Sequence, residues 1–138
     1  MILLAPSFGV TTWRVLGIHL LGPTGYMRMK QKRASDYFLD NRLYTYLETP
    51  LDKAADVIRL GREAMRDMNR LEDLPVMMAV GERESTVSLK KMLKVARDNP
   101  WIRLVRLPRS RHILPVEPDS EALFEDSIRF VKECLGSE

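Results

Sequence analysis

Residues 75–112 are PVMMAVGERESTVSLKKMLKVARDNPWIRLVRLPRSRH, and their pattern indicates the class of fold. It starts with an apolar run that Pro75 opens and Gly81 closes. No face of the run is polar, which is typical of a central parallel strand covered on both sides. An apolar stripe over 89–96 then follows helical spacing, and residues 102–107 predict another strand. Strand, helix and strand in this order predict parallel pairing through a right-handed crossover.

The flanking segments extend this pattern in both directions. Residues 2–5 are a continuous apolar run and predict a further buried strand. Thr49 and Pro50 are typical of a helix start, since threonine caps and proline fits the first turn, and helical spacing continues to about residue 71. The last helix opens at 118–120 and carries four apolar residues on one face: Phe124, Ile128, Val131 and Leu135. We therefore expect an α/β fold with a parallel sheet of about three strands and flanking helices.

Composition excludes several classes of protein. The 138 residues favour a single domain, and 22 Lys and Arg against 19 Asp and Glu give a net charge of +3, too dilute for a dedicated nucleic-acid binder. The one cysteine, Cys134, excludes an internal disulfide, and we expect it at the core or its boundary. With two histidines we expect neither a metal site nor a cofactor. No apolar run reaches the roughly 18 residues of a membrane span, and residues 1–5 are too short for a signal-peptide core, so the default expectation is a cytoplasmic protein.

Two residues with acid–base chemistry follow neighbouring strands of the predicted sheet. Glu84 comes just after the strand that ends at Gly81, and His112 comes just after the next strand. Parallel strands lie about 4.8 Å apart and end at the same sheet edge, so the carboxylate can reach an imidazole nitrogen. Such a carboxylate fixes the tautomer of a histidine that acts as a general base. The other histidine, His19, lies in an apolar stretch and is expected to be structural.

The same residues carry a resemblance to a known family. Residues 81–87, GERESTV, resemble the Gly-x-x-Asp-x-x-Val segment after the seventh strand of α/β-hydrolases, and Ser110-Arg111-His112 resembles their Ser-Gly-His after the eighth. The pattern is similar to that of small carboxylesterases and of the monoacylglycerol lipase or lysophospholipase group. The resemblance implies one partial α/β-hydrolase domain over 1–138. Residues 1–9 would form a core strand, 10–74 a helical cap with its return helix, and 75–138 the part that carries the acid and the histidine.

The resemblance also implies roles for single residues. His112 would be the triad base and Glu84 the triad acid in place of the usual aspartate, with Glu82 as the alternative acid. Arg111 stands where the family has glycine and would crowd the turn. The sequence has no Gly-x-Ser-x-Gly elbow and no oxyanion segment, so it resembles the carboxyl-terminal portion of a serine hydrolase of carboxylic esters or thioesters. We expect the chain to need a nucleophile half and to be inactive alone.

Two alternatives remain open. Residues 5–9, APSFG, place Ser7 in an elbow-like spacing, although Pro6 restricts the turn and no convincing strand follows before residue 74. We therefore favour an ordinary strand end over a nucleophile there. The second alternative is a non-catalytic remnant that serves as an oligomerisation or partner-binding module, because three strands leave a sheet edge free to pair with a second copy or a complementary chain.

The predicted cap has two compositional features. A basic run contains Arg28, Lys30, Lys32 and Arg33, and its simplest interpretation is a solvated surface; attraction to anionic lipid or acyl-phosphate substrates is the alternative. Methionine and tyrosine are also frequent there, at Tyr26, Met27, Met29, Tyr37, Tyr44 and Tyr46. They would suit an adaptable pocket for an acyl chain, and packing within the cap would account for them equally well.

Overall fold

The computed structural model describes residues 1–9, 28–30 and 48–136. The chain divides into two compact units, one formed by Met1–Thr11 with Gly61–Glu138 and the other by Thr12–Leu60. Most of the predicted cap, with His19, Lys32 and Arg33 and all the tyrosines named above, lies outside the described residues.

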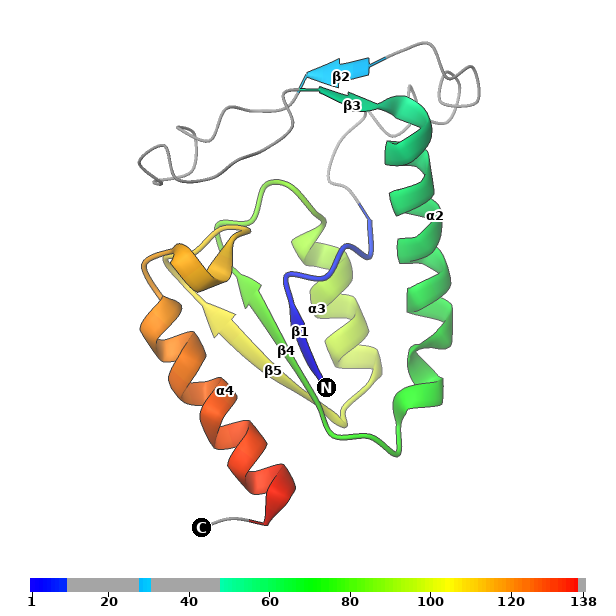
Figure 1. The fold of residues 1–138 in the computed structure, drawn as a ribbon. Helices are drawn as coiled ribbons and strands as arrows, with labels where there is room; N and C mark the ends of the chain where they lie inside the picture. The colour runs from blue at the N-terminus through cyan, green and yellow to red at the C-terminus, as the bar shows by residue number, and fades with distance from the viewer. Residues whose placement is uncertain (10–27, 31–47, 137–138) are drawn as a thin grey trace. The chain divides into compact units, whose positions relative to one another are not determined.

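A three-stranded parallel sheet forms the core of the first unit (Figure 1). Its strands are β1 (Ile2–Leu4), β4 (Val76–Gly81) and β5 (Ile102–Leu107), in the order β1-β4-β5. The register places Ile2 beside Met77 and Met77 beside Arg103. All of β4 is buried, as its unbroken apolar run predicts for a central strand. The predicted α/β class is therefore confirmed.

Helices cover both faces of this sheet. In chain order they are α2 (Leu51–Asp67), the 3-10 turn η3 (Met68–Leu71), α3 (Leu89–Asp98), the 3-10 turn η4 (Leu114–Val116) and α4 (Ser120–Leu135). Alternate residues of β4 belong to two separate clusters. Met78 packs in the cluster that contains Met92 of α3, and Ala79 packs in the cluster that contains Leu123 of α4. Because side chains alternate along a strand, α3 and α4 lie on opposite faces.

The start of α3 is fixed by a cap. Ser88 has extended backbone, and its side-chain oxygen accepts a hydrogen bond from the Lys91 N–H at 3.4 Å. The Ser88 N–H in turn donates to the Gly9 carbonyl at 2.7 Å. The segment that follows β1 is thus tied to the helix that follows β4.

The second unit contains two short strands that the sequence did not predict. β2 (Arg28–Lys30) and β3 (Glu48–Pro50) pair antiparallel, with Met29 beside Thr49. Three residues are too few to display the alternation by which a strand is recognised in sequence. Pro50 was expected in the first turn of the helix, but it ends β3, and α2 begins one residue later.

The apolar face predicted for α4 is present, but it does not face the sheet. Leu123 and Phe130 are the buried residues of this helix, whereas Phe124, Ile128, Val131 and Leu135 are exposed. Cys134 was expected at the core or its boundary and is exposed instead. Helical spacing groups residues on a face but does not say which of two apolar faces meets the core.

Candidate active site

The carboxyl ends of β4 and β5 are joined by backbone hydrogen bonds between the loops that follow them. The Glu82 N–H donates to the Leu107 carbonyl at 2.9 Å, and the Arg83 N–H donates to the Ser110 carbonyl at 3.0 Å. Gly81, at the end of β4, makes this approach possible. A Cβ atom there would lie 2.1 Å from the Arg111 carbonyl oxygen and 2.5 Å from the Ser110 carbonyl oxygen. Only glycine leaves room for the two loops to meet.

Glu84 and His112 meet where these loops converge. Glu84 Oε2 lies 2.7 Å from Nδ1 of His112. The other oxygen of Glu84, Oε1, accepts the backbone N–H groups of Thr86 at 2.5 Å and Val87 at 3.2 Å. The Glu84 side chain is fully buried, and that of His112 is 31% exposed. The carboxylate is therefore held rigidly on one side of the imidazole, while part of the ring reaches solvent.

The electrostatics of the pair favour its charged form. The hydrogen bond that His112 donates to Glu84 is the main cause that raises the pKa of His112 above 6.5; burial opposes this rise, and the charge of Glu117 adds to it. Burial raises the pKa of Glu84, but the bonds from His112 and from the Thr86 and Val87 amides outweigh burial and bring that pKa below 4.5. With Nδ1 occupied by Glu84, Nε2 is the nitrogen left to exchange a proton, and no described residue hydrogen-bonds to it.

Glu117 holds the backbone of the histidine loop, a role that sequence reasoning missed. Its buried carboxylate accepts the N–H groups of His112 at 3.3 Å and Ile113 at 3.1 Å on Oε1, and that of Arg111 on Oε2. Three consecutive amides thus point at one carboxylate. In the sequence, Glu117 is only an acidic residue between η4 and α4. Such a residue is found on solvated surfaces too, so the sequence does not indicate that its carboxylate is buried.

Asp119 binds the start of the same loop through hydrogen bonds. It accepts the Arg109 N–H and Nε–H, both at 2.7 Å, and the Ser110 hydroxyl at 3.0 Å. Burial would raise the pKa of Asp119, but the bonds from Arg109 and Ser110 outweigh burial and keep that pKa below 3.8. Together, Glu117 and Asp119 fix the loop from both ends, so His112 is placed by buried hydrogen bonds and not by the strand end alone.

The remaining candidate residues lie elsewhere. Glu82, the alternative acid, forms an ion pair with Arg106 of β5 at 2.9 Å and does not contact His112. Ser7 Oγ is buried and has no hydrogen-bond partner among the described residues, so the structure does not bring it to His112. Arg111 approaches Gly81 through its backbone carbonyl and meets Glu117 through its N–H.

Over residues 1–9, 28–30 and 48–136, no three His, Cys, Asp or Glu side chains gather where they could hold a metal ion. Among the helices of those residues, none combines the length and the apolar character needed to cross a bilayer.

Comparison with known proteins identifies the fold. No family model and no curated protein matches the chain. A metagenome-derived lipolytic enzyme, from structural work on LipS and LipT, matches with a TM-score of 0.78 and 15% identity, over 96% of this chain and 54% of that one. A soluble variant of monoglyceride lipase from Saccharomyces cerevisiae, bound to a substrate analogue, matches with a TM-score of 0.65 and 16% identity, over 86% of this chain and 48% of that one. The chain spans about half the length of these lipolytic enzymes, and it has the predicted partial α/β-hydrolase fold.

Proposed function

We propose that this partial α/β-hydrolase fold supplies the acid and the histidine of a serine hydrolase that acts on carboxylic ester or thioester substrates. The observation that carries the proposal is the 2.7 Å contact between Glu84 Oε2 and His112 Nδ1 at the carboxyl ends of adjacent parallel strands. The nucleophile and the oxyanion donors would come from a complementary half of the fold. This chain would then be its carboxyl-terminal portion.

In the proposed reaction, His112 and Glu84 carry the proton chemistry. Glu84 holds the proton on Nδ1, which leaves the Nε2 lone pair free to accept the proton of the incoming serine hydroxyl. The serine oxygen then attacks the acyl carbon, and the imidazolium that forms is stabilised by the buried carboxylate. His112 next gives this proton to the departing alcohol or thiol. Water repeats the same steps on the acyl-enzyme and releases the acid.

The proposal is tested by restoring the other half of the fold. The chain is co-expressed with the part of the metagenome-derived lipolytic enzyme that its match leaves uncovered, and the co-purified complex is assayed for hydrolysis of p-nitrophenyl butyrate. We expect activity that falls by about 10³-fold or more in His112→Gln and Glu84→Gln.

The matched control for this assay is Glu82→Gln. Glu82 follows the same strand and pairs with Arg106 instead of His112, so its substitution should leave the rate within about twofold of wild type. A complex that assembles but does not hydrolyse ester, or whose rate is unchanged in His112→Gln, contradicts the proposed function.

The second candidate is a non-catalytic module that binds a partner through the edge of β1 that no other described strand pairs with. It is favoured by one observation, the exposed apolar face of α4. The assay above separates the two functions, because a binding module would assemble equally well with or without His112 and would never gain activity.

A further inference from the structure

The outer side of α3 carries a row of cations, which we call the basic stripe. It consists of Lys90, Lys94 and Arg97, and all three residues are exposed. At about 100° per residue, they lie within about 60° of one another around the helix axis. Met92 lies on the opposite side of α3 and is fully buried in the cluster that contains Met78 of β4. The basic stripe therefore points away from the core.

The helix holds too few acids to neutralise these cations. Its four cations are Lys90, Lys91, Lys94 and Arg97, and its one acid is Asp98. Asp98 is shared, because one of its oxygens pairs with Lys94 and the other lies 3.2 Å from Nε of Arg97. One carboxylate cannot neutralise two cations, so the basic stripe keeps a net positive charge.

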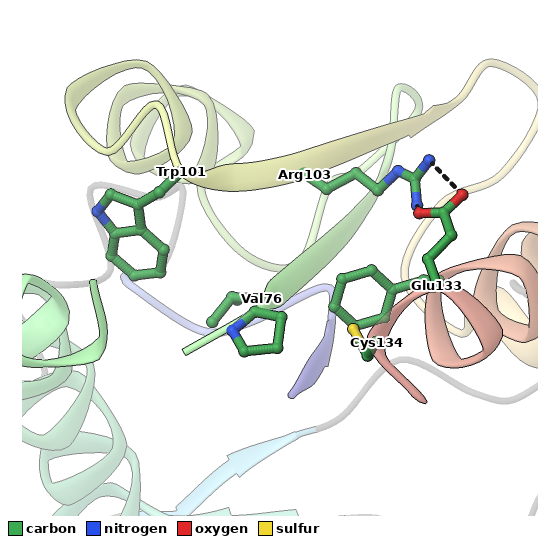
Figure 2. A pocket seen from close by; sticks show the side chains of 7 residues that line it. Val76, Trp101, Arg103, Glu133 and Cys134 are labelled. Atoms are coloured by element: carbon green, nitrogen blue, oxygen red, sulfur yellow. Dashed lines mark hydrogen bonds and ion pairs between the residues drawn. The ribbon is translucent and has the colours of Figure 1, made fainter. Parts of the chain in front are cut away.

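The cations of the edge strand β5 are neutralised, in contrast to those of α3. Arg103 binds Glu133 of α4 through two bonds, Nη1 to Oε2 at 2.6 Å and Nη2 to Oε1 at 3.3 Å (Figure 2), and Arg106 pairs with Glu82 at 2.9 Å. The helix α4 itself carries four acids against two cations. Because α3 and α4 cover opposite faces of the sheet, the α3 side is positive and the α4 side is negative.

We propose that the basic stripe of α3 binds the headgroups of an anionic lipid bilayer. The inference goes beyond the proposed function and does not depend on it. Each Lys or Arg held close to an anionic membrane surface strengthens binding about fivefold. The apolar side of α3 packs in the core and cannot insert into the bilayer, so the contact is electrostatic. Such binding is reversible and weakens as salt screens the charges.

Two observations favour a lipid surface over an acidic protein. A protein interface has an apolar centre, but none of the large apolar residues that are exposed in the described part of the chain belongs to α3. Two of the three cations of the basic stripe are lysines. Lysine binds as a point charge on a flexible stem and needs no fixed partner geometry, which suits headgroups that move freely in the bilayer plane.

The size of the basic stripe argues against a nucleic acid. From Lys90 to Arg97 it extends about 10 Å along a single helix. A nucleic-acid binder presents a broader basic face that follows the phosphate backbone. A narrow row of charges is sufficient for a flat anionic surface.

Vesicle binding tests the proposal. The full chain is titrated with vesicles of phosphatidylcholine alone and with vesicles that also contain about 30% phosphatidylglycerol, and bound protein is measured by co-sedimentation. We expect binding to the anionic vesicles only, and its loss at about 0.5 M salt. The variant Lys90→Gln/Lys94→Gln should bind the anionic vesicles about tenfold more weakly or worse.

The charge-matched control is Arg129→Gln/Lys132→Gln. It removes the same number of cations from exposed positions of α4, on the other face of the sheet. We expect it to weaken binding no more than about twofold, because those cations point away from the bilayer. All four substituted side chains are exposed, so circular dichroism and melting should show both variants folded like the wild type.

Each other outcome overturns the proposal. If the chain does not bind anionic vesicles, or binds neutral ones equally well, the basic stripe does not recognise lipid charge. If the two double variants lose binding alike, the overall charge of the chain accounts for it and α3 has no special part. If the chain binds a short DNA duplex through Lys90 and Lys94 but ignores the vesicles, the partner is a nucleic acid.

Discussion

The contact between Glu84 and His112 can be examined without any substrate, because it makes the stability of the chain depend on pH. The raised pKa of His112 means that its contribution is complete below 6.5 and is lost as pH rises through the raised value. The lowered pKa of Glu84 means that its contribution is complete above 4.5 and is lost as pH falls through the lowered value. The pair therefore stabilises the fold most between pH 4.5 and 6.5.

Glu84→Gln should reduce this pH dependence, because only the smaller effect of Glu117 would then raise the pKa of His112. Within that window we expect the variant to lose about 1–3 kcal/mol in the free energy of unfolding, with a smaller loss at higher pH. NMR titration should show the pKa of His112 above 6.5 in wild type and lower in the variant, since the main cause of the rise has been removed. An identical imidazole titration in the two proteins would show that the two side chains do not interact in solution.

Glu117→Gln addresses the other carboxylate at the histidine loop. Replacing one oxygen by an amide NH₂ leaves at least one of the amides of Arg111, His112 and Ile113 without its acceptor. We expect a loss of about 1–3 kcal/mol in stability and faster hydrogen exchange at these three amides. The exposed Glu125→Gln, on α4, is the control and should change neither quantity. Unaltered exchange at residues 111–113 would mean that Glu117 does not hold the loop.

At the scale of elements, the end of β4 depends on the absence of a side chain at Gly81. Gly81→Ala would place a Cβ within 2.1 Å of a backbone carbonyl, so the loop that carries His112 must move. We expect a loss of about 2 kcal/mol or more, and a shift of the His112 ring resonances. Gly136→Ala is the contrasting substitution, because nothing lies within 4 Å of its Cβ and only its positive φ of 66° is penalised, by about 1 kcal/mol. Equal effects of the two substitutions would argue against the close approach.

The strands β4 and β5 could be predicted from the sequence. β4 was predicted within a residue of its bounds because it is an unbroken apolar run, and β5, whose Arg103 and Arg106 are exposed, was predicted at its observed bounds. The contact between Glu84 and His112 could be predicted because the two residues follow adjacent parallel strands. By contrast, the hydrogen bonds of Glu117 join a carboxylate to backbone amides, which every residue carries, so no side-chain pattern marks them. The exposure of the apolar face of α4 could not be predicted, because the spacing of apolar residues shows that they share a helix face but not whether that face meets the sheet.

For the whole molecule, we expect no covalent labelling of the chain alone by a fluorophosphonate probe. Ser7 Oγ is buried and has no hydrogen bond to His112, so no described serine is activated by the base. Intact-mass measurement after incubation should therefore show only the unmodified protein. A single adduct that disappears in Ser7→Ala would make Ser7 an activated nucleophile and the chain a hydrolase in its own right.

The pairing of β1 with β4 also has a consequence for the order in which the protein folds. β4 and β5 are separated by 26 positions from Val76 to Ile102, whereas Ile2 must find Met77 across 75. For a flexible chain this longer closure costs about 1 kcal/mol more, so the β4–α3–β5 segment forms first and β1 joins it late. β1 is thus among the last strands to be paired. Its apolar residues, Ile2, Leu3 and Leu4, therefore stay unpaired until the β4–α3–β5 segment has formed.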